Sequence, residues 1–216
     1  MPRRRVVWDC ATGNGQAARD LARYFERVIA TDGSQEQIAH AESVSNVEFR
    51  VATADASGLE PRSVDAVTIA QALHWFAHEP FFAEVRRVTV PGGLVAAWSY
   101  GSCHAGVDVE ELLREFEERI VGPYWPPERK WVDEGYRTIP FPFDEVPAPP
   151  FELRATWTLR QLGAYLDSWS AVANYRRDRG EDPVAPALER IARHWESPDR
   201  TREVTWPLNI RAGRVG

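Results

Sequence analysis

The sequence predicts an α/β fold in which a mostly parallel sheet of seven strands is flanked by helices. Short apolar runs alternate with segments whose apolar residues recur at helical spacing, which is the pattern of parallel strands joined by crossover helices. The length of 216 residues, with 44% hydrophobic and 27% charged residues, is typical of a soluble chain with a sizeable core. We therefore expect a single domain over residues 1–216.

The expected elements follow in order along the chain. A first strand at Val6–Trp8 leads through a glycine-containing turn into a helix whose apolar face carries Ala17, Leu21 and Phe25. The other strands are expected at residues 28–30, 47–52, 64–70, 94–99, 151–158 and 203–210. The other helices are expected at residues 35–43, 80–88, 107–120, 159–178 and 184–196.

The later part of the chain has a different composition. Residues 122–150 are rich in proline and aromatic residues, and five of the nine tryptophans lie between residues 125 and 195. Long stretches of this kind inside a compact domain usually form functional loops or caps. We expect a core made of residues 1–106 and about 151–216, with a cap inserted at about 107–150.

Composition argues against several classes of function. The net charge of −6 has the wrong sign for binding nucleic acid by its phosphates, and no apolar run reaches the length of a membrane helix. Cys10 and Cys103 form no C-x-x-C motif, which argues against a disulfide framework and against a metal site. We expect a cytoplasmic protein that binds no metal, no nucleic acid and no membrane.

The segment after the first strand is the most informative motif. Asp9 closes the strand, and Gly13 and Gly15 let the backbone turn tightly before the next helix presents its N-terminus to a ligand. This loop also satisfies a dinucleotide fingerprint, with Asp32 placed 19 residues after Gly13 to hold a ribose. A nicotinamide-dependent oxidoreductase is therefore one alternative.

Three features favour a positively charged nucleoside instead. The Asp9 carboxylate would repel a pyrophosphate, which a dinucleotide enzyme must bind at this place. Asp55, beside Ala56, follows the third strand, where it can accept a hydrogen bond from an adenine amino group. The fourth strand runs into polar and aromatic residues from Gln71 to Phe76 at the carboxyl edge, where open α/β sheets bind ligands.

These residues carry a family resemblance. The Asp9-x-Ala11-x-Gly13-x-Gly15 loop, Asp32, Asp55, the stretch AQALHWF at 70–76 and VPGG at 90–93 resemble a class I S-adenosylmethionine-dependent methyltransferase, with its Rossmann-like sheet. The segments at 122–125, 139–143 and 167–172 further resemble the small-molecule branch that contains trans-aconitate and cantharidin-type methyltransferases.

The resemblance implies a cofactor site for S-adenosylmethionine. It places the loop from Asp9 to Gly15 beneath the methionine part, Asp32 on the ribose hydroxyls and Asp55 at the adenine, and we add Ala56 and Gln71 to this site. The first glycine of the family loop is Ala11 here, and we expect this residue to keep a negative φ. Members of the branch begin with helices that cover the cofactor, whereas the first strand starts almost at once here. We therefore expect an exposed apolar patch beside that strand and self-association through the uncovered sheet face.

The expected acceptor is a small molecule methylated on a carboxylate or hydroxyl oxygen. A carboxylate is already ionised at neutral pH, whereas a hydroxyl acceptor needs a base, for which His74 is the candidate. Trp75, Tyr124 and Trp125 are candidates for the walls of the acceptor site. Candidates for a guanidinium clamp on an anionic acceptor are Arg129, Arg137 and Arg176. A protein that binds the cofactor without turnover is the alternative from outside the enzymes.

Overall fold

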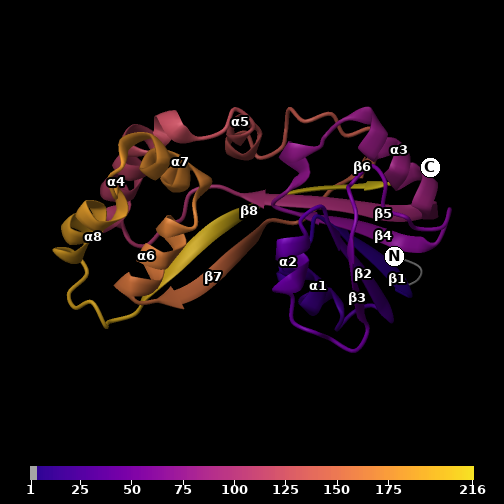
Figure 1. Cartoon of the computed structure of the whole chain (residues 1–216), viewed down its shortest axis with the longest axis horizontal. Coiled ribbons are helices and arrows are strands. Elements are labelled where there is room, and N and C mark those ends of the chain that lie inside the picture. Colours follow the sequence, from indigo (N-terminus) through magenta and orange to yellow (C-terminus); the bar gives the residue numbers. More distant parts are fainter. Residues whose placement is uncertain (1–3) are drawn as a thin grey trace. The chain divides into compact units, whose positions relative to one another are not determined.

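The computed structural model describes residues 4–216 and divides them into two compact units (Figure 1). The first unit contains the residues up to Ser99 together with Glu134–Pro149 and Asn209–Gly216. The second unit contains Tyr100–Asp133 and Pro150–Leu208. Each unit is described by itself.

The first unit carries the predicted alternation of strands and helices. Its elements are β1 (Val6–Cys10), α1 (Gln16–Leu21), β2 (Arg27–Asp32), α2 (Gln35–Ala39), β3 (Val47–Val51), β4 (Val64–Ala70), the 3₁₀ turn η1 (Leu73–Trp75), α3 (Glu79–Val88), β5 (Thr89–Tyr100, whose last residue belongs to the second unit) and β6 (Asp144–Val146). The long strand β8 (Arg202–Arg214) contributes residues to both units.

The sheet is mostly parallel, as the sequence predicts. Its order is β3-β2-β1-β4-β5-β8-β6, with β7 (Phe151–Trp157) paired to β8, so that the described chain has eight strands rather than seven. The additional strand is β6, which pairs antiparallel with the end of β8. A short edge strand with the sequence Asp-Glu-Val has no alternation of apolar and polar residues, and the sequence pattern could not reveal it.

Alternate apolar side chains anchor the helices to the sheet. Val7, Val28 and Ala66 pack with Ala18 and Phe25 in one buried cluster on the side of α1. Figure 1 shows α1 and α2 on one side of the sheet and α3 on the other. The buried face of α3 is formed by Phe81, Phe82, Val85 and Val88, as its spacing predicts. Residues of strands β1, β2 and β4 are therefore buried between the sheet and α1.

The second unit is built mainly from helices around its own core. Its elements are α4 (Val107–Glu115), the π-helical turn η2 (Phe116–Ile120), the 3₁₀ turn η3 (Gly122–Tyr124), α5 (Arg129–Asp133), β7, α6 (Leu159–Asp167), α7 (Ser170–Arg179) and α8 (Val184–Ala192). Val109, Leu113 and Phe116 of the expected apolar stripe are buried in this core. The expected helix 159–178 is divided in two, because the chain is extended at Trp169 between α6 and α7.

The two units divide the chain differently from the expected core and cap. Residues 134–149 lie in the first unit, whereas 150–208 join 100–133 in the second. The reason is the pairing of β8: its residues from Arg202 to Leu208 pair with β7 in the second unit, and its last residues pair with β6 in the first. A long strand shared in this way has no signature in local composition.

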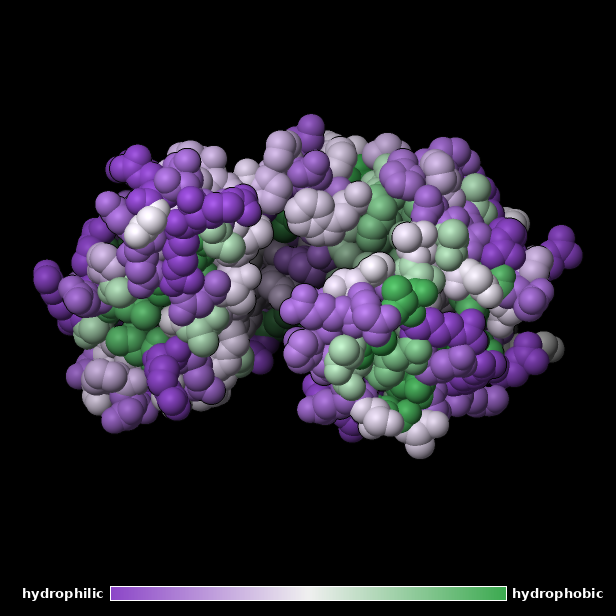
Figure 2. All heavy atoms as spheres, viewed as in Figure 1, coloured by the Kyte–Doolittle hydropathy of each residue, from purple (hydrophilic) through white to green (hydrophobic). Residues whose placement is uncertain are grey.

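The apolar patch expected beside the first strand stays a prediction, because the strand itself is buried, whereas Leu21, Val47 and Phe49 on the side of α1 are only partly buried. Val7, Trp8 and Cys10 of β1 are buried, and so are Val28 and Ile29 of the adjacent strand β2. The large hydrophobic residues that are exposed are Tyr24, Val51, Trp75, Val107, Phe151 and Leu153. Figure 2 shows one face of the molecule, on which contiguous hydrophobic areas lie between hydrophilic side chains. In the part of the chain that is described, no helix has the length and apolarity needed to cross a membrane.

Candidate active site

The candidate site lies at the carboxyl edge of the central strands in the first unit. The parallel register sets Asp9 of β1 opposite Thr68 of β4, and it sets Asp32 of β2 opposite Val51 of β3. The predicted acids at the ends of β1 and β2 therefore belong to the same edge, as expected for an open parallel sheet.

Asp9 is a fully buried carboxylate with two hydroxyl donors. The Thr12 hydroxyl donates to one carboxylate oxygen at 2.5 Å, and the Thr68 hydroxyl donates to the other at 2.7 Å. Burial raises the pKa of Asp9 to about 6, although the hydrogen bonds from Thr12 and Thr68 act in the opposite direction. Asp9 therefore links the loop, through Thr12, to β4, through Thr68. Neither threonine was among the candidates from the sequence.

Asp32 links the same loop to the start of α2. Its carboxylate accepts hydrogen bonds from the backbone N–H of Gly13 at 2.9 Å and of Ser34 at 2.8 Å. Ser34 is the N-cap of α2, and its hydroxyl accepts from the backbone N–H of Gln37 at 3.2 Å. Asp32 is partly exposed, so its carboxylate can serve the loop and still meet a ligand.

The backbone of the loop is left-handed at three positions. Gly13 and Gly15 have φ values of 57° and 86°, and a Cβ at Gly15 would come within 2.6 Å of the Phe49 ring. Ala11 has a φ of 54°, so the expectation of a negative φ is wrong. The neighbouring anchors explain this result, because Asp9 and the backbone bond from Thr12 N–H to Thr31 C=O at 2.9 Å hold Ala11 on both sides. The turn therefore contains local strain at Ala11.

The segment after β3 forms a tight turn that presents Asp55 and Ala56 to solvent. The backbone N–H of Ala56 donates to the Thr53 carbonyl at 3.2 Å. A hydrogen bond from the Thr53 side chain, helped by the backbone of Asp55, lowers the pKa of the Asp55 carboxyl. Asp55 is therefore ionised and accessible, as an acceptor for an amino group must be.

The segment after β4 places His74 in the 3₁₀ turn η1. Its Nδ1 lies 2.8 Å from the hydroxyl of Tyr136, and both side chains are buried. Burial raises the pKa of Tyr136, more strongly than hydrogen bonds with the backbone of His74 and Leu73 lower it. Tyr136 therefore keeps its proton at neutral pH. It lies far along the chain in the proline-rich segment, and no local signal identified it.

The other two candidates on this segment differ in exposure. Trp75 is 55% exposed, and its ring centroid lies 4.8 Å from that of His74. Gln71 is half-buried with a φ of 53°, and its backbone N–H donates to the Trp98 carbonyl of β5 at 2.8 Å. This backbone bond holds the segment against the sheet where the chain leaves β4.

The remaining aromatic candidates belong to the second unit. The Tyr124 hydroxyl donates to Asp178 at 3.2 Å, and the Trp125 ring packs on Trp169 with a centroid distance of 5.4 Å. Their expected contact with the acceptor stays a prediction.

Two of the three clamp candidates already have carboxylate partners. Arg129 lies 4.1 Å above the Trp125 ring and pairs with Glu117 at 2.5 Å, in a bridge that is largely buried. Arg176 pairs with Asp167 and Asp182, each at 2.5 Å. A clamp on an anionic acceptor needs an available guanidinium, and these two are engaged within the second unit. Arg137 is exposed.

The donor set fits an organic cofactor with a sulfonium group. Among residues 4–216, no three side chains of His, Cys, Asp or Glu come together in a way that could hold a metal ion. The site instead offers a buried carboxylate, a left-handed loop and two further acids at strand ends. When S-adenosylmethionine is bound, it supplies a methyl group on a positively charged sulfur.

Comparison with known proteins gives the family. A family model described as a methyltransferase domain matches residues 8–97. A Dictyostelium discoideum protein, provisionally named as a methyltransferase, is 32% identical over 200 residues, which cover 91% of this chain and 76% of that protein. A Saccharomyces cerevisiae protein, provisionally named as an S-adenosylmethionine-dependent methyltransferase, is 26% identical over 216 residues, covering 83% of this chain and 74% of that one.

A solved structure agrees over nearly the whole chain. The protein from Anaeromyxobacter dehalogenans, provisionally named as a type II methyltransferase, has a TM-score of 0.92 and 43% sequence identity. The match covers 99% of this chain and 91% of that one. Sequence, sheet order and relatives thus agree, and the chain belongs to the class I S-adenosylmethionine-dependent methyltransferases.

Proposed function

We propose that this protein transfers the methyl group of S-adenosylmethionine to a carboxylate or hydroxyl oxygen of a small molecule. The observation that carries this proposal is the shared anchoring of one loop. Asp9 accepts a hydrogen bond from the Thr12 hydroxyl, and Asp32 accepts one from the backbone N–H of Gly13. Two acids from adjacent strands therefore stabilise the conformation of the same turn, residues 11–15. Negative charge beneath and beside this turn favours a cation and disfavours a pyrophosphate.

Each cofactor residue has a distinct role in this proposal. The backbone from Ala11 to Gly15 forms the floor for the methionine part, and Asp9 acts on that part through the loop and through its charge, because its side chain is enclosed. The Asp32 carboxylate accepts hydrogen bonds from the ribose hydroxyls. Asp55 and Ala56 meet the adenine, and Gln71 borders the cofactor from the end of β4.

The acceptor decides what His74 does. Methyl transfer is an in-line displacement, and positioning in a site that excludes water lowers its barrier for any oxygen acceptor. A carboxylate needs no base. For a hydroxyl acceptor, His74 takes the proton on Nε2 while Nδ1–H donates to the Tyr136 oxygen, which fixes the ring. Tyr136 is thus a positioning residue for His74.

Acceptor binding in the first unit is assigned to Trp75, which is 55% exposed beside His74, and Tyr124 and Trp125 of the second unit stay candidates from the sequence. Large rings exclude water and offer flat apolar contacts to a small molecule. The resemblance of segments 122–125 and 139–143 to trans-aconitate and cantharidin-type enzymes supports a small acceptor.

Calorimetry and a methylation assay test the proposal. S-adenosylhomocysteine should bind the chain of residues 1–216 with 1:1 stoichiometry, whereas NAD should not bind. Transfer of a labelled methyl group from S-adenosylmethionine is then measured with one panel of small carboxylic acids and one of phenols and alcohols. Binding of S-adenosylhomocysteine without transfer to any member of either panel would favour a binding protein without turnover.

A further inference from the structure

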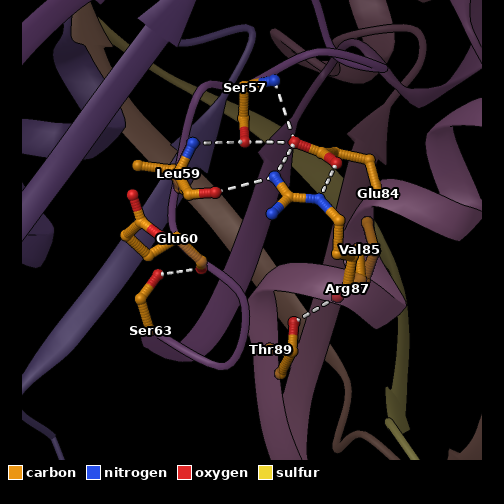
Figure 3. A network of polar contacts seen from close by, with 8 residues as sticks. All are labelled: Ser57, Leu59, Glu60, Ser63, Glu84, Val85, Arg87 and Thr89. Carbon is orange, nitrogen blue, oxygen red and sulfur yellow. Dashed lines mark hydrogen bonds and ion pairs between the residues drawn. The ribbon is translucent and has the colours of Figure 1, made fainter.

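A polar network connects α3 to Ser57 (Figure 3), the residue that follows the turn with Asp55. Glu84, on the buried face of α3, accepts hydrogen bonds from the backbone N–H of Ser57 at 2.9 Å and from the Ser57 hydroxyl. Arg87, one turn further along α3, donates to the two oxygens of Glu84 at 2.7 and 2.8 Å. Glu84 therefore joins a loop and a helix through four donors.

This network holds the backbone on the C-terminal side of Ser57 as well. Arg87 also donates to the Leu59 carbonyl at 2.7 Å, and the Leu59 N–H donates to the Ser57 hydroxyl at 3.2 Å. Glu84 is only 7% exposed and Leu59 is only 5% exposed. Burial acts to raise the pKa of Glu84, but the bonds from Arg87 and Ser57 outweigh it and lower the pKa. A buried, ionised carboxylate must keep its hydrogen-bond donors in place, so Glu84 constrains the positions of Ser57 and Arg87.

The turn between Thr53 and Ala56 lies between two fixed points. On one side, β3 pairs with β2, and the backbone N–H of Ala52 donates to the Asp32 carbonyl at 3.0 Å. On the other side, Ser57 is held by Glu84. Only four residues separate these anchors, and Asp55 is one of them. The place of the Asp55 carboxylate thus depends on a side chain that is remote in sequence.

We propose that Glu84 is a positioning residue for adenine recognition, because it fixes the turn from which Asp55 reads the amino group of the base. This inference rests on the proposed cofactor site. In addition to stabilising the fold, the network around Glu84 would then give the protein a preference for purine bases that carry the amino group of adenine.

The experiment compares two product analogues. S-adenosylhomocysteine carries the adenine amino group, and the matching analogue with an unsubstituted purine base carries hydrogen at C6 in its place. A hydrogen bond to a charged acceptor corresponds to a preference of about 10-fold or more, so the wild-type protein should bind the adenine compound at least about 10-fold more tightly. In Glu84→Gln, this preference should fall to about 3-fold or less, with the loss confined to S-adenosylhomocysteine.

The matched control is Glu79→Gln, which makes the same change at the exposed start of α3 and should leave the preference unchanged. Ser57→Ala removes the hydroxyl at the loop end of the network. If Glu84→Gln does not fold, the preference between the two analogues is measured with Ser57→Ala, in which it should fall as well. A role in stability alone would weaken both analogues equally or neither, and that result would overturn the proposal. If the wild-type protein bound neither analogue, the proposed cofactor site would fail as well; if it bound both equally, only the adenine assignment and this inference would fail.

Discussion

The strained residue Ala11 offers a direct test of how the cofactor loop is built. Its φ of 54° lies in the left-handed region, where an L-residue with a Cβ is disfavoured by about 1–2 kcal/mol. Ala11→Gly removes that cost. The greater freedom of glycine in the unfolded chain offsets about 0.5–1 kcal/mol of the gain. We expect the free energy of unfolding of the first unit to rise by about 0.5 kcal/mol.

The matched control is the same substitution at an ordinary helical position. Ala83 is exposed in the interior of α3, also in the first unit. Ala83→Gly should lower the free energy of unfolding by about 1 kcal/mol, because glycine has the lower helix propensity. The two variants should therefore differ by about 1.5 kcal/mol in favour of Ala11→Gly.

Amide hydrogen exchange in β1 and β2 is the suitable measurement. Exchange of these buried strands reports on the first unit, whereas a whole-chain unfolding signal would combine contributions from both compact units. Equal destabilisation by Ala11→Gly and Ala83→Gly would refute the reasoning, since it would mean that the native loop carries no strain at residue 11.

Three further predictions concern the site. Burial raises the pKa of Asp9 to about 6, so folding favours its protonated form. The free energy of unfolding of the wild type should therefore fall by up to about 3 kcal/mol as the pH rises from 4 to 6. Asp9→Asn should not show this loss when amide exchange is measured over the same pH range. Tyr136→Phe should lower transfer to a hydroxyl acceptor about 10-fold and shift its pH profile, while transfer to a carboxylate stays unchanged. Asp32→Ala should weaken S-adenosylhomocysteine binding at least about 10-fold in calorimetry.

Each of these has its own control. The pH experiment is read as the difference between wild type and Asp9→Asn, which cancels the other carboxylates, and an unchanged slope would contradict the raised pKa. For Tyr136→Phe, equal losses with both acceptor types would indicate a disturbed fold rather than a misplaced imidazole. For Asp32→Ala, wild-type affinity would remove the ribose assignment. Asp32→Asn is the milder variant, because its amide oxygen can still accept from one of the two backbone donors, Gly13 and Ser34.

Much of the first unit follows from short-range patterns in the sequence. The period of the apolar residues distinguishes strands from helices, and the parallel order brings the ends of β1 and β2 to one edge. Asp9 and Asp32 could be chosen because each closes a strand, which is a local property. The family loop was likewise recognisable from the spacing of Gly13 and Gly15.

Tertiary structure alone decided the features that depend on partners distant in the chain. Ala11 is left-handed because its neighbours are anchored, although alanine by itself prefers a negative φ, and the expectation based on that preference was wrong. Tyr136 reaches His74 across 62 positions, and Glu84 reaches Ser57 across 27. A local pattern records which conformations a segment prefers, whereas burial and hydrogen bonding between remote segments determine which of them the folded chain keeps.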